Sequence, residues 1–293
     1  MKDSKENSKN KVQLFIAVSL LVIIIIGAIT GTVLFLSDND GNKPATQNKP
    51  LLGVWWWDNR LDSSYLDFAE ENGVTEIYCY YSSFGQKTTD FIKSASEKNI
   101  DVLWLAGKYE WIEDYDSLKA KIGEFLDFQQ SSEYKFKGIH LDIEPHQHPE
   151  FDQKREDLIT AFAELTLALK RDYPDVRIEY DIPFWLEDEV TVHGITKPAY
   201  EFVIDNAYRV TIMSYRDSAE KILDCAKEEI GYAKSVGKPL NLSVETGENE
   251  DIVTFYEEGN AYMFGELSAV RKALPDNFGI AIHHIKDWRE LKK

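Results

Sequence analysis

The sequence predicts an α/β protein, a (β/α)8 TIM barrel preceded by one N-terminal transmembrane helix. Two observations lead to this prediction. An uncharged apolar run lies close to the N-terminus, and residues 51–293 alternate eight short strand-like runs with helical patterns. Such alternation is typical of a parallel sheet whose strands are joined by helices, and eight repeats are the number that closes this kind of barrel.

The transmembrane helix is predicted from residues 14–36, which contain no charged residue and are rich in Ile, Val and Leu. About 20 such residues cross the hydrocarbon core of a bilayer. Residues 1–13 hold four Lys against one Asp and one Glu, so the positive-inside rule keeps them cytoplasmic and places the barrel outside the cytoplasm. We expect an uncleaved signal anchor in the cell membrane, because the run is longer than a signal-peptide core and no small-x-small site follows it. Residues 37–50 are polar and predict a flexible linker.

The net charge narrows the possible partners of the predicted barrel domain, residues 51–293. The whole chain carries −18, residues 1–36 carry +2 and residues 37–50 are neutral, which leaves −20 on the barrel. So acidic a domain is a poor candidate for binding nucleic acid or anionic lipid. The two cysteines, Cys79 and Cys225, are expected to be small buried hydrophobic residues.

The eight strands are predicted from apolar runs rich in β-branched and aromatic residues. They are residues 51–57, 74–81, 101–106, 138–144, 176–181, 209–215, 239–245 and 279–284. Apolar residues at three- and four-residue spacing predict the helices between them. These are residues 61–72, 88–98, 115–131, 152–172, 218–236 and 265–274, with a weaker helix within 198–207 after a long loop.

An open doubly wound sheet is the alternative fold, but it would be expected to show a Gly-rich phosphate loop after an early strand. The segment that follows the first strand is instead Trp-Trp-Trp-Asp-Asn-Arg, residues 55–60. The barrel is therefore favoured. In such barrels, chemistry is carried by residues at the carboxyl ends of the strands.

The fourth strand carries the most informative motif, Gly-Ile-His-Leu-Asp-Ile-Glu-Pro at residues 138–145. Because strand side chains alternate faces, His140, Asp142 and Glu144 share one face and the three Ile and Leu residues share the other. Polar side chains in a row on a buried strand are costly unless they line a site. An edge strand with a solvated polar face is the structural alternative.

The other strand ends gather aromatic rings and carboxylates. Aromatic faces stack on the apolar faces of pyranose rings, and carboxylates or His bind hydroxyl groups, so the mixture indicates a polysaccharide or oligosaccharide substrate. The candidate substrate contacts are Trp55, Trp57, Asp58, Tyr80, His140, Asp181, Arg216 and His284.

Cleavage of a glycosidic bond usually needs a proton donor and a second group that attacks or stabilises the anomeric centre. Glu144, the last residue of its strand, is the predicted general acid/base. The second group is either Asp142, which would polarise a substrate acetamido group, or Glu245, which would attack from the seventh strand. The charge of Asp142 is expected to raise the proton affinity of Glu144.

The fourth-strand motif resembles that of family 18 glycoside hydrolases, the chitinase-like barrels, whose pattern is Asp-Gly-x-Asp-x-Asp-x-Glu. Gly138, Asp142 and Glu144 match this pattern, whereas Lys137 and His140 replace its first two Asp residues. The resemblance implies that Glu144 is the acid, that Asp142 binds the acetamido group and that the configuration is retained.

A second segment also resembles that family. Met-Ser-Tyr-Arg at residues 213–216 is similar to its sixth-strand Met-x-Tyr-Asp, with Arg216 in place of Asp. The resemblance implies that Tyr215 donates a hydrogen bond to the acetamido group.

Two other families share parts of the motif. Family 25 lysozymes, which act on peptidoglycan, also end a barrel strand in Asp-x-Glu. A large clan of barrels with catalytic Glu on strands four and seven carries Asn-Glu-Pro at the fourth strand; here Ile143 replaces Asn, and Glu144, Pro145 and Glu245 fit. All three resemblances agree on Glu144.

The sequence thus predicts a membrane-anchored glycoside hydrolase for a cell-surface or extracellular polysaccharide, with N-acetylated amino sugars as one option. We expect no metal and no cofactor, since the spacing indicates no third ligand beside His146 and His148. The alternatives are a non-catalytic surface barrel that binds carbohydrate and a metal-dependent deacetylase or amidohydrolase.

Overall fold

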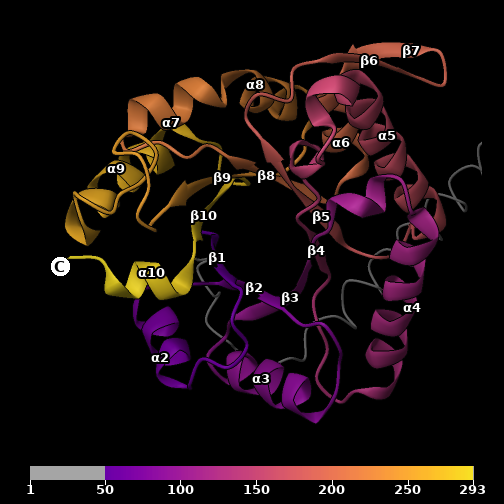
Figure 1. The fold of residues 1–293 in the computed structure, drawn as a ribbon. Coiled ribbons are helices and arrows are strands. Elements are labelled where there is room, and N and C mark those ends of the chain that lie inside the picture. Colours follow the sequence, from indigo (N-terminus) through magenta and orange to yellow (C-terminus); the bar gives the residue numbers. More distant parts are fainter. Residues whose placement is uncertain (1–49, 293) are drawn as a thin grey trace, which may run out of the picture. The chain divides into compact units, whose positions relative to one another are not determined.

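The computed structural model describes residues 50–292, which form a closed barrel of eight parallel strands surrounded by helices (Figure 1). Around the barrel, each strand pairs with the barrel strands that precede and follow it in the chain, and the last strand pairs with the first. The predicted TIM barrel is confirmed. The strands are β1 (Leu52–Trp56), β2 (Glu76–Tyr80), β3 (Asp101–Ala106), β4 (Ile139–Leu141), β5 (Ile178–Pro183), β8 (Arg209–Met213), β9 (Leu240–Glu245) and β10 (Gly279–His283).

The helices lie outside the ring of strands (Figure 1). They are α2 (Ser64–Glu71), α3 (Gln86–Glu97), α4 (Tyr115–Ser131), α5 (Phe151–Asp172), α6 (Ala199–Asn206), α7 (Ala219–Cys225), α8 (Lys227–Val236), α9 (Asn260–Ala273) and α10 (Ile285–Glu290). Two short 3-10 helices, η1 (Tyr109–Ile112) and η2 (Pro145–Gln147), follow β3 and β4.

The helix layer differs from the sequence prediction in three places. The single helix predicted over residues 218–236 is two helices, because Ala226 leaves the helical conformation between α7 and α8. The loop after β5 contains an antiparallel hairpin, β6 (Glu189–Val192) and β7 (Ile195–Pro198). Its two turn residues, His193 and Gly194, both have positive φ, as tight hairpin turns require. Helix α10 was not predicted.

The predicted N-terminal segments 1–13 and 14–36, and all but the last residue of the predicted linker 37–50, lie outside the described residues. Within residues 50–292, none of the helices combines the length and the apolar character needed to span a bilayer.

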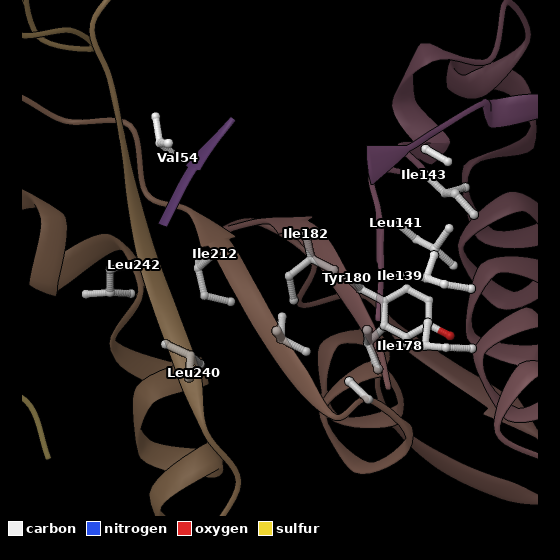
Figure 2. Packing of buried hydrophobic residues seen from close by; sticks show 14 of the residues in the cluster. Val54, Ile139, Leu141, Ile143, Ile178, Tyr180, Ile182, Ile212, Leu240 and Leu242 are labelled. Atoms are coloured by element: carbon white, nitrogen blue, oxygen red, sulfur yellow. The ribbon is translucent and has the colours of Figure 1, made fainter. Parts of the chain in front are cut away.

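Strand alternation separates two packing layers. Ile139, Leu141 and Ile143 point away from the barrel interior and are almost completely buried in the core between strands and helices (Figure 2). Burial of each such side chain contributes about 1.5–3 kcal/mol. A smaller inner core fills the barrel itself and consists of Trp55, Tyr78, Leu103, Leu105 and Ala281.

Ion pairs close the barrel interior at the amino ends of the strands, which we call the lower end, opposite the mouth. They form the floor cluster, which consists of Glu76, Arg177, Glu179 and Arg209. Arg177 Nη2 lies 2.6 Å from carboxylate oxygens of both Glu76 and Glu179. Arg209 also bridges Glu76 and Glu179, and its Nη2 lies 2.9 Å from Glu179 Oε1. Burial alone would raise the pKa of Glu179, but Arg209, His140 and Arg177 outweigh it and lower that pKa to about 2. These charges therefore stabilise one another below the site.

Candidate active site

The end of β4 delivers Asp142 and Glu144 to the barrel mouth. The Asp142 amide donates to the Ala106 carbonyl at 2.9 Å and so extends the pairing with β3. Gly107 makes this approach possible, because a Cβ atom there would lie 1.9 Å from the Asp142 carbonyl oxygen. Pro145, the first residue of η2, then ends the strand.

Glu144 is held by the loop that follows it. His146 Nε2 lies 3.0 Å from Glu144 Oε2, and the Gln147 amide donates to Glu144 Oε1. The His146 ring in turn packs edge-on against Trp185 at 5.2 Å. The Glu144 side chain is 13% exposed. Sequence reasoning left His146 and Gln147 without a role, although their position directly after Glu144 was the available signal.

Asp142 lies between other carboxylates. Its pKa is raised well above the ordinary value, first by burial and then by the charges of Asp181 and Glu144, against the opposing effect of His140. Its Oδ1 atom is buried and has no hydrogen-bond partner among the described residues. An unpaired buried acceptor is costly, so this atom is suited to a donor that arrives with a ligand.

His140 and Asp181, predicted as substrate contacts, lie in the sealed interior below Asp142. His140 is fully buried and Asp181 is 1% exposed. Two residues along a strand span about 7 Å. His140 precedes Asp142 by two residues and Asp181 precedes the end of β5 by two residues, so both lie one layer of side chains deeper in the barrel. Trp55, also predicted as a substrate contact, is 1% exposed and belongs to the same inner layer.

Tyr215, which follows β8, faces the carboxylates of the mouth. Burial raises its pKa well above 10, and the charges of Glu245, Asp181, Asp142 and Glu144 raise it further. The Tyr215 hydroxyl is therefore a neutral donor surrounded by acidic groups.

Glu245, the last residue of β9, is fixed by three contacts. Its Oε1 accepts from the Thr246 and Gly247 amides, both at 2.7 Å, and its Oε2 lies 2.8 Å from His283 Nδ1. Trp57 Nε1 donates to His283 Nε2 at 3.0 Å, so Nδ1 carries the imidazole proton toward Glu245. Burial alone would raise the pKa of Glu245, but His283 and the two amides outweigh it and lower that pKa.

The histidine that faces the mouth is His283, not the predicted His284. His283 lies 6.0 Å from the Tyr215 ring, centroid to centroid. His284 follows the end of β10 and instead pairs with Asp287 of α10 at 3.0 Å, with its ring 5.1 Å from the His283 ring. Burial and the neighbouring His283 lower the pKa of His284. Side chains alternate faces along β10, and this alternation would have predicted that His283 faces the mouth.

The remaining predicted contacts lie around the rim. Trp57 and Tyr80 form an aromatic pair with centroids 6.2 Å apart, and Tyr80 is 37% exposed. Asp58 is engaged by Arg60 at 2.8 Å, and this hydrogen bond lowers the pKa of Asp58 to about 2. The Arg216 guanidinium stacks on Phe184 at 4.5 Å and donates to the Tyr215 carbonyl. Arg216 therefore supports the Tyr215 backbone rather than joining the carboxylates.

Within residues 50–292, no group of three or more His, Cys, Asp or Glu side chains is arranged to hold a metal ion. The predicted pair His146 and His148 separates: His146 contacts Glu144, whereas His148 lies 3.3 Å from Glu113.

No protein-family model and no curated protein matches this sequence. Solved structures do match the fold. A mutant β-1,3-glucanosyltransferase from Rhizomucor miehei in complex with laminaritriose has a TM-score of 0.53 at 11% identity, over 80% of this chain and 86% of that one. An endo-β-N-acetylglucosaminidase from Cordyceps militaris has a TM-score of 0.52 at 13% identity, over 84% and 88% of the two chains.

At these identities the similarity establishes a shared fold. The chain is a TIM barrel of the kind found in these carbohydrate-active enzymes. Its mouth combines two carboxyl groups on β4, a tyrosine and an aromatic rim, an arrangement that fits the resemblance to family 18 barrels.

Proposed function

We propose that this protein is a glycoside hydrolase that acts on a cell-surface or extracellular polysaccharide containing N-acetylated amino sugars. The observation that carries the proposal is the position of Asp142 and Glu144 together at the barrel mouth, with the Tyr215 hydroxyl in the field of both carboxyl groups. A TIM barrel alone does not define an activity, so the site has to carry this argument.

Glu144 is the proposed general acid/base. Its carboxyl group is the outermost of the β4 acids, and its loop partners His146 and Gln147 orient it from the side. In the first step Glu144 protonates the glycosidic oxygen as the bond to the anomeric carbon breaks. In the second step its carboxylate takes a proton from the attacking water.

Asp142 is the proposed partner of Glu144, in preference to Glu245. Both oxygens of Glu245 are occupied by backbone amides and His283, which suits an anchor for the end of β9. Asp142 instead offers the unpartnered Oδ1 atom to a substrate acetamido N–H. The acetamido oxygen would then close on the anomeric carbon, and water would reopen this bond with retention of configuration.

The surroundings of the mouth suit a glycan without negative charges. Trp57 and Tyr80 supply aromatic faces at the rim. The loop after β9, residues 246–259, carries five acidic residues and no Lys or Arg, so a polyanionic chain would be repelled.

We also propose that residues 14–36 anchor the protein in the cell membrane with the barrel outside the cytoplasm. The support is the uncharged apolar run and the basic flank that precedes it. We expect the protein in the membrane fraction after an alkaline wash, and digestion of the barrel by protease added to wall-free intact cells. Recovery of the whole chain in the soluble fraction would contradict the anchor.

The catalytic assignment is tested with the full-length protein against peptidoglycan, chitin-type oligosaccharides and amino-sugar exopolysaccharides. Glu144→Gln should lower kcat by at least about 100-fold, the usual contribution of a general acid/base, while substrate binding is kept. Glu113→Gln is the matched control, because Glu113 is an exposed carboxylate on the neighbouring loop. Undiminished hydrolysis by Glu144→Gln would refute the assignment. Binding without turnover by the wild type would identify a non-catalytic sugar-binding barrel.

A further inference from the structure

A buried assembly of Trp55, His140 and Asp181 lies directly beneath the Asp142 and Glu144 pair. We propose that this assembly is a positioning group: it holds Asp181 ionised, so that the proton of the carboxyl cluster stays on Asp142 and Glu144. The catalytic meaning of this inference rests on the proposed glycoside hydrolase function, but the position of the proton can be measured without any activity.

Both carboxylate oxygens of Asp181 are hydrogen-bonded within the assembly. Trp55 Nε1 donates to Asp181 Oδ2 at 3.1 Å, and His140 Nε2 lies 2.8 Å from Asp181 Oδ1. The His140 ring stacks on Tyr78 with centroids 3.7 Å apart and an interplanar angle of 10°. Each oxygen of Asp181 thus has a donor, and the two donors come from different strands, β1 and β4.

The imidazole carries a positive charge. Its second nitrogen, Nδ1, lies 3.5 Å from Glu179 Oε2, a distance for a charge contact rather than a hydrogen bond. Burial alone would lower the pKa of His140, but Asp181 and Glu179 outweigh it and raise that pKa to about 9. His140 is therefore an imidazolium at neutral pH, between two carboxylates.

The groups that face the carboxyl cluster come from several strands. The His140 imidazolium and Asp181 face Asp142 from below, and Glu144 faces it from the mouth. Tyr215 faces the cluster from the end of β8, and the charge of Glu245 also acts on the Tyr215 hydroxyl. Asp142 thus meets two carboxylates and one cation.

Burial raises the pKa of both Asp142 and Asp181, and that of Asp142 more strongly. These two groups and Glu144 are neighbours, so at least one proton remains among the three. Asp181 has a donor on each oxygen and a cation beside it, whereas Asp142 Oδ1 has no partner among the described residues. Ionisation therefore costs the least free energy at Asp181. The proton stays on Asp142 or Glu144, next to the glycosidic bond. Without the assembly, Asp181 would take up that proton at a depth that substrate cannot reach.

The assembly also gives a reason for the departure from the family 18 pattern at residue 140. That pattern has an Asp at the position of His140 on the fourth strand. Here the deep carboxylate is Asp181 on β5, and the imidazole at position 140 is its partner.

The first test is the pH dependence of kcat/KM for the full-length protein. Asp181→Asn removes the negative charge below the pair, so the pair loses its proton more easily and the alkaline limb moves to lower pH, by about one pH unit for a ten-fold change in proton affinity. Trp55→Phe removes one donor from Asp181, so Asp181 competes with the pair for the proton. The plateau of kcat/KM should fall, and the alkaline limb should move slightly to higher pH.

Trp56→Phe is the matched control for Trp55→Phe. Trp56 is the next residue of β1, is equally buried on the opposite face, and also makes one indole hydrogen bond, to the Asp58 carbonyl at 2.8 Å. The alkaline limb of kcat/KM for Trp56→Phe should stay at the wild-type pH. A purely structural role for Trp55 and Asp181 would lower kcat and leave the alkaline limb in place, and that result would overturn the proposal. Trp55→Phe carries the test if Asp181→Asn does not fold.

The second test needs no substrate. Carbon-13 NMR of Asp-labelled full-length protein should show one carboxyl group still protonated at pH 7, and Asp142→Asn should remove its signal. Trp55→Phe should lower the fraction of that group that is protonated at pH 7, because Asp181 takes up part of the proton. An Asp142 carboxyl that titrates near its ordinary pKa would overturn the proposal even if the enzyme is active. A protonated Asp142 in a protein without hydrolytic activity would refute only the proposed function.

Discussion

The floor cluster and the mouth of the barrel differ in how their buried charged side chains are paired. In the floor cluster, two glutamates meet two arginines at distances of 2.6–2.9 Å, so every charge has a partner. The mouth gathers Asp142, Glu144 and Glu245, with Asp181 one layer below. Within residues 50–292 the ion-pair partners of these carboxyl groups are the histidines His140, His146 and His283 and include no Lys or Arg. The balanced region holds the barrel together, whereas the unbalanced region retains a proton and is available for chemistry.

The largest expected effect comes from breaking the floor. Arg209→Met leaves Glu76 and Glu179 without one of their two cations, and loss of one partner from a buried pair costs about 3–5 kcal/mol. Denaturant unfolding of the variant measures this loss. Lys98→Met is the matched control, since Lys98 also bridges two carboxylates, Asp67 and Glu70, but at the surface. The control should change the free energy of unfolding by about 1 kcal/mol or less. Equal losses for the two variants would contradict the special role of the floor.

An unpaired carboxyl outside both regions sharpens the comparison. Glu229 of α8 is fully buried, and neither of its oxygens has a partner among the described residues. Burial raises its pKa to about 8, so the folded state binds this proton more tightly than the unfolded chain does. The contribution of Glu229 to stability is thus complete below pH 4.5 and falls as the pH rises toward 8, by about 1.4 kcal/mol per pH unit.

Glu229→Gln should remove this slope and make the protein more stable than the wild type near pH 8. Urea unfolding at pH 5.5 and pH 8 gives the difference, and Glu228→Gln, on the exposed side of the same helix, is the control. An unchanged slope in Glu229→Gln would show that Glu229 finds a partner. Because Glu229 lies away from the mouth, the kcat of Glu229→Gln should equal that of the wild type. This result would distinguish a buried carboxyl group that only lowers stability from the carboxyl groups of the site.

The smallest expected effect concerns Tyr215. Tyr215→Phe removes a hydroxyl donor that faces the three mouth carboxyl groups and Asp181 below them, and the loss of one such hydrogen bond corresponds to about ten-fold in kcat/KM. The effect should be larger on an N-acetylated substrate than on the same oligosaccharide without acetyl groups. An equal effect on both substrates would remove Tyr215 from acetamido recognition.

The strands and most helices could be predicted because hydrophobic periodicity determines them locally. All eight predicted barrel strands overlap observed ones, and the motif around Asp142 and Glu144 lies at the mouth as strand alternation requires. The break at Ala226 and the hairpin at residues 189–198 depend on packing against neighbouring elements, which a single sequence does not reveal.

The depth of each side chain was the part that sequence reasoning missed. Trp55, His140 and Asp181 have the residue types of a sugar site, yet they lie one layer below the mouth. Their partners come from strands far apart in the chain, and barrel stagger decides which residues share a layer. His283 was predictable from alternation along β10, whereas its bond to Glu245 depends on the register between β9 and β10.

The central claim is that the chemistry lies in the two β4 carboxyl groups and not in the one anchored at the end of β9. The most direct test compares kcat of Asp142→Asn and Glu245→Gln on an N-acetylated amino-sugar oligosaccharide. We predict that Asp142→Asn loses about 100-fold or more, and that Glu245→Gln, whose amide oxygen can still accept from the two backbone amides, stays within about ten-fold of the wild type. An inactive Glu245→Gln beside an active Asp142→Asn would contradict the account.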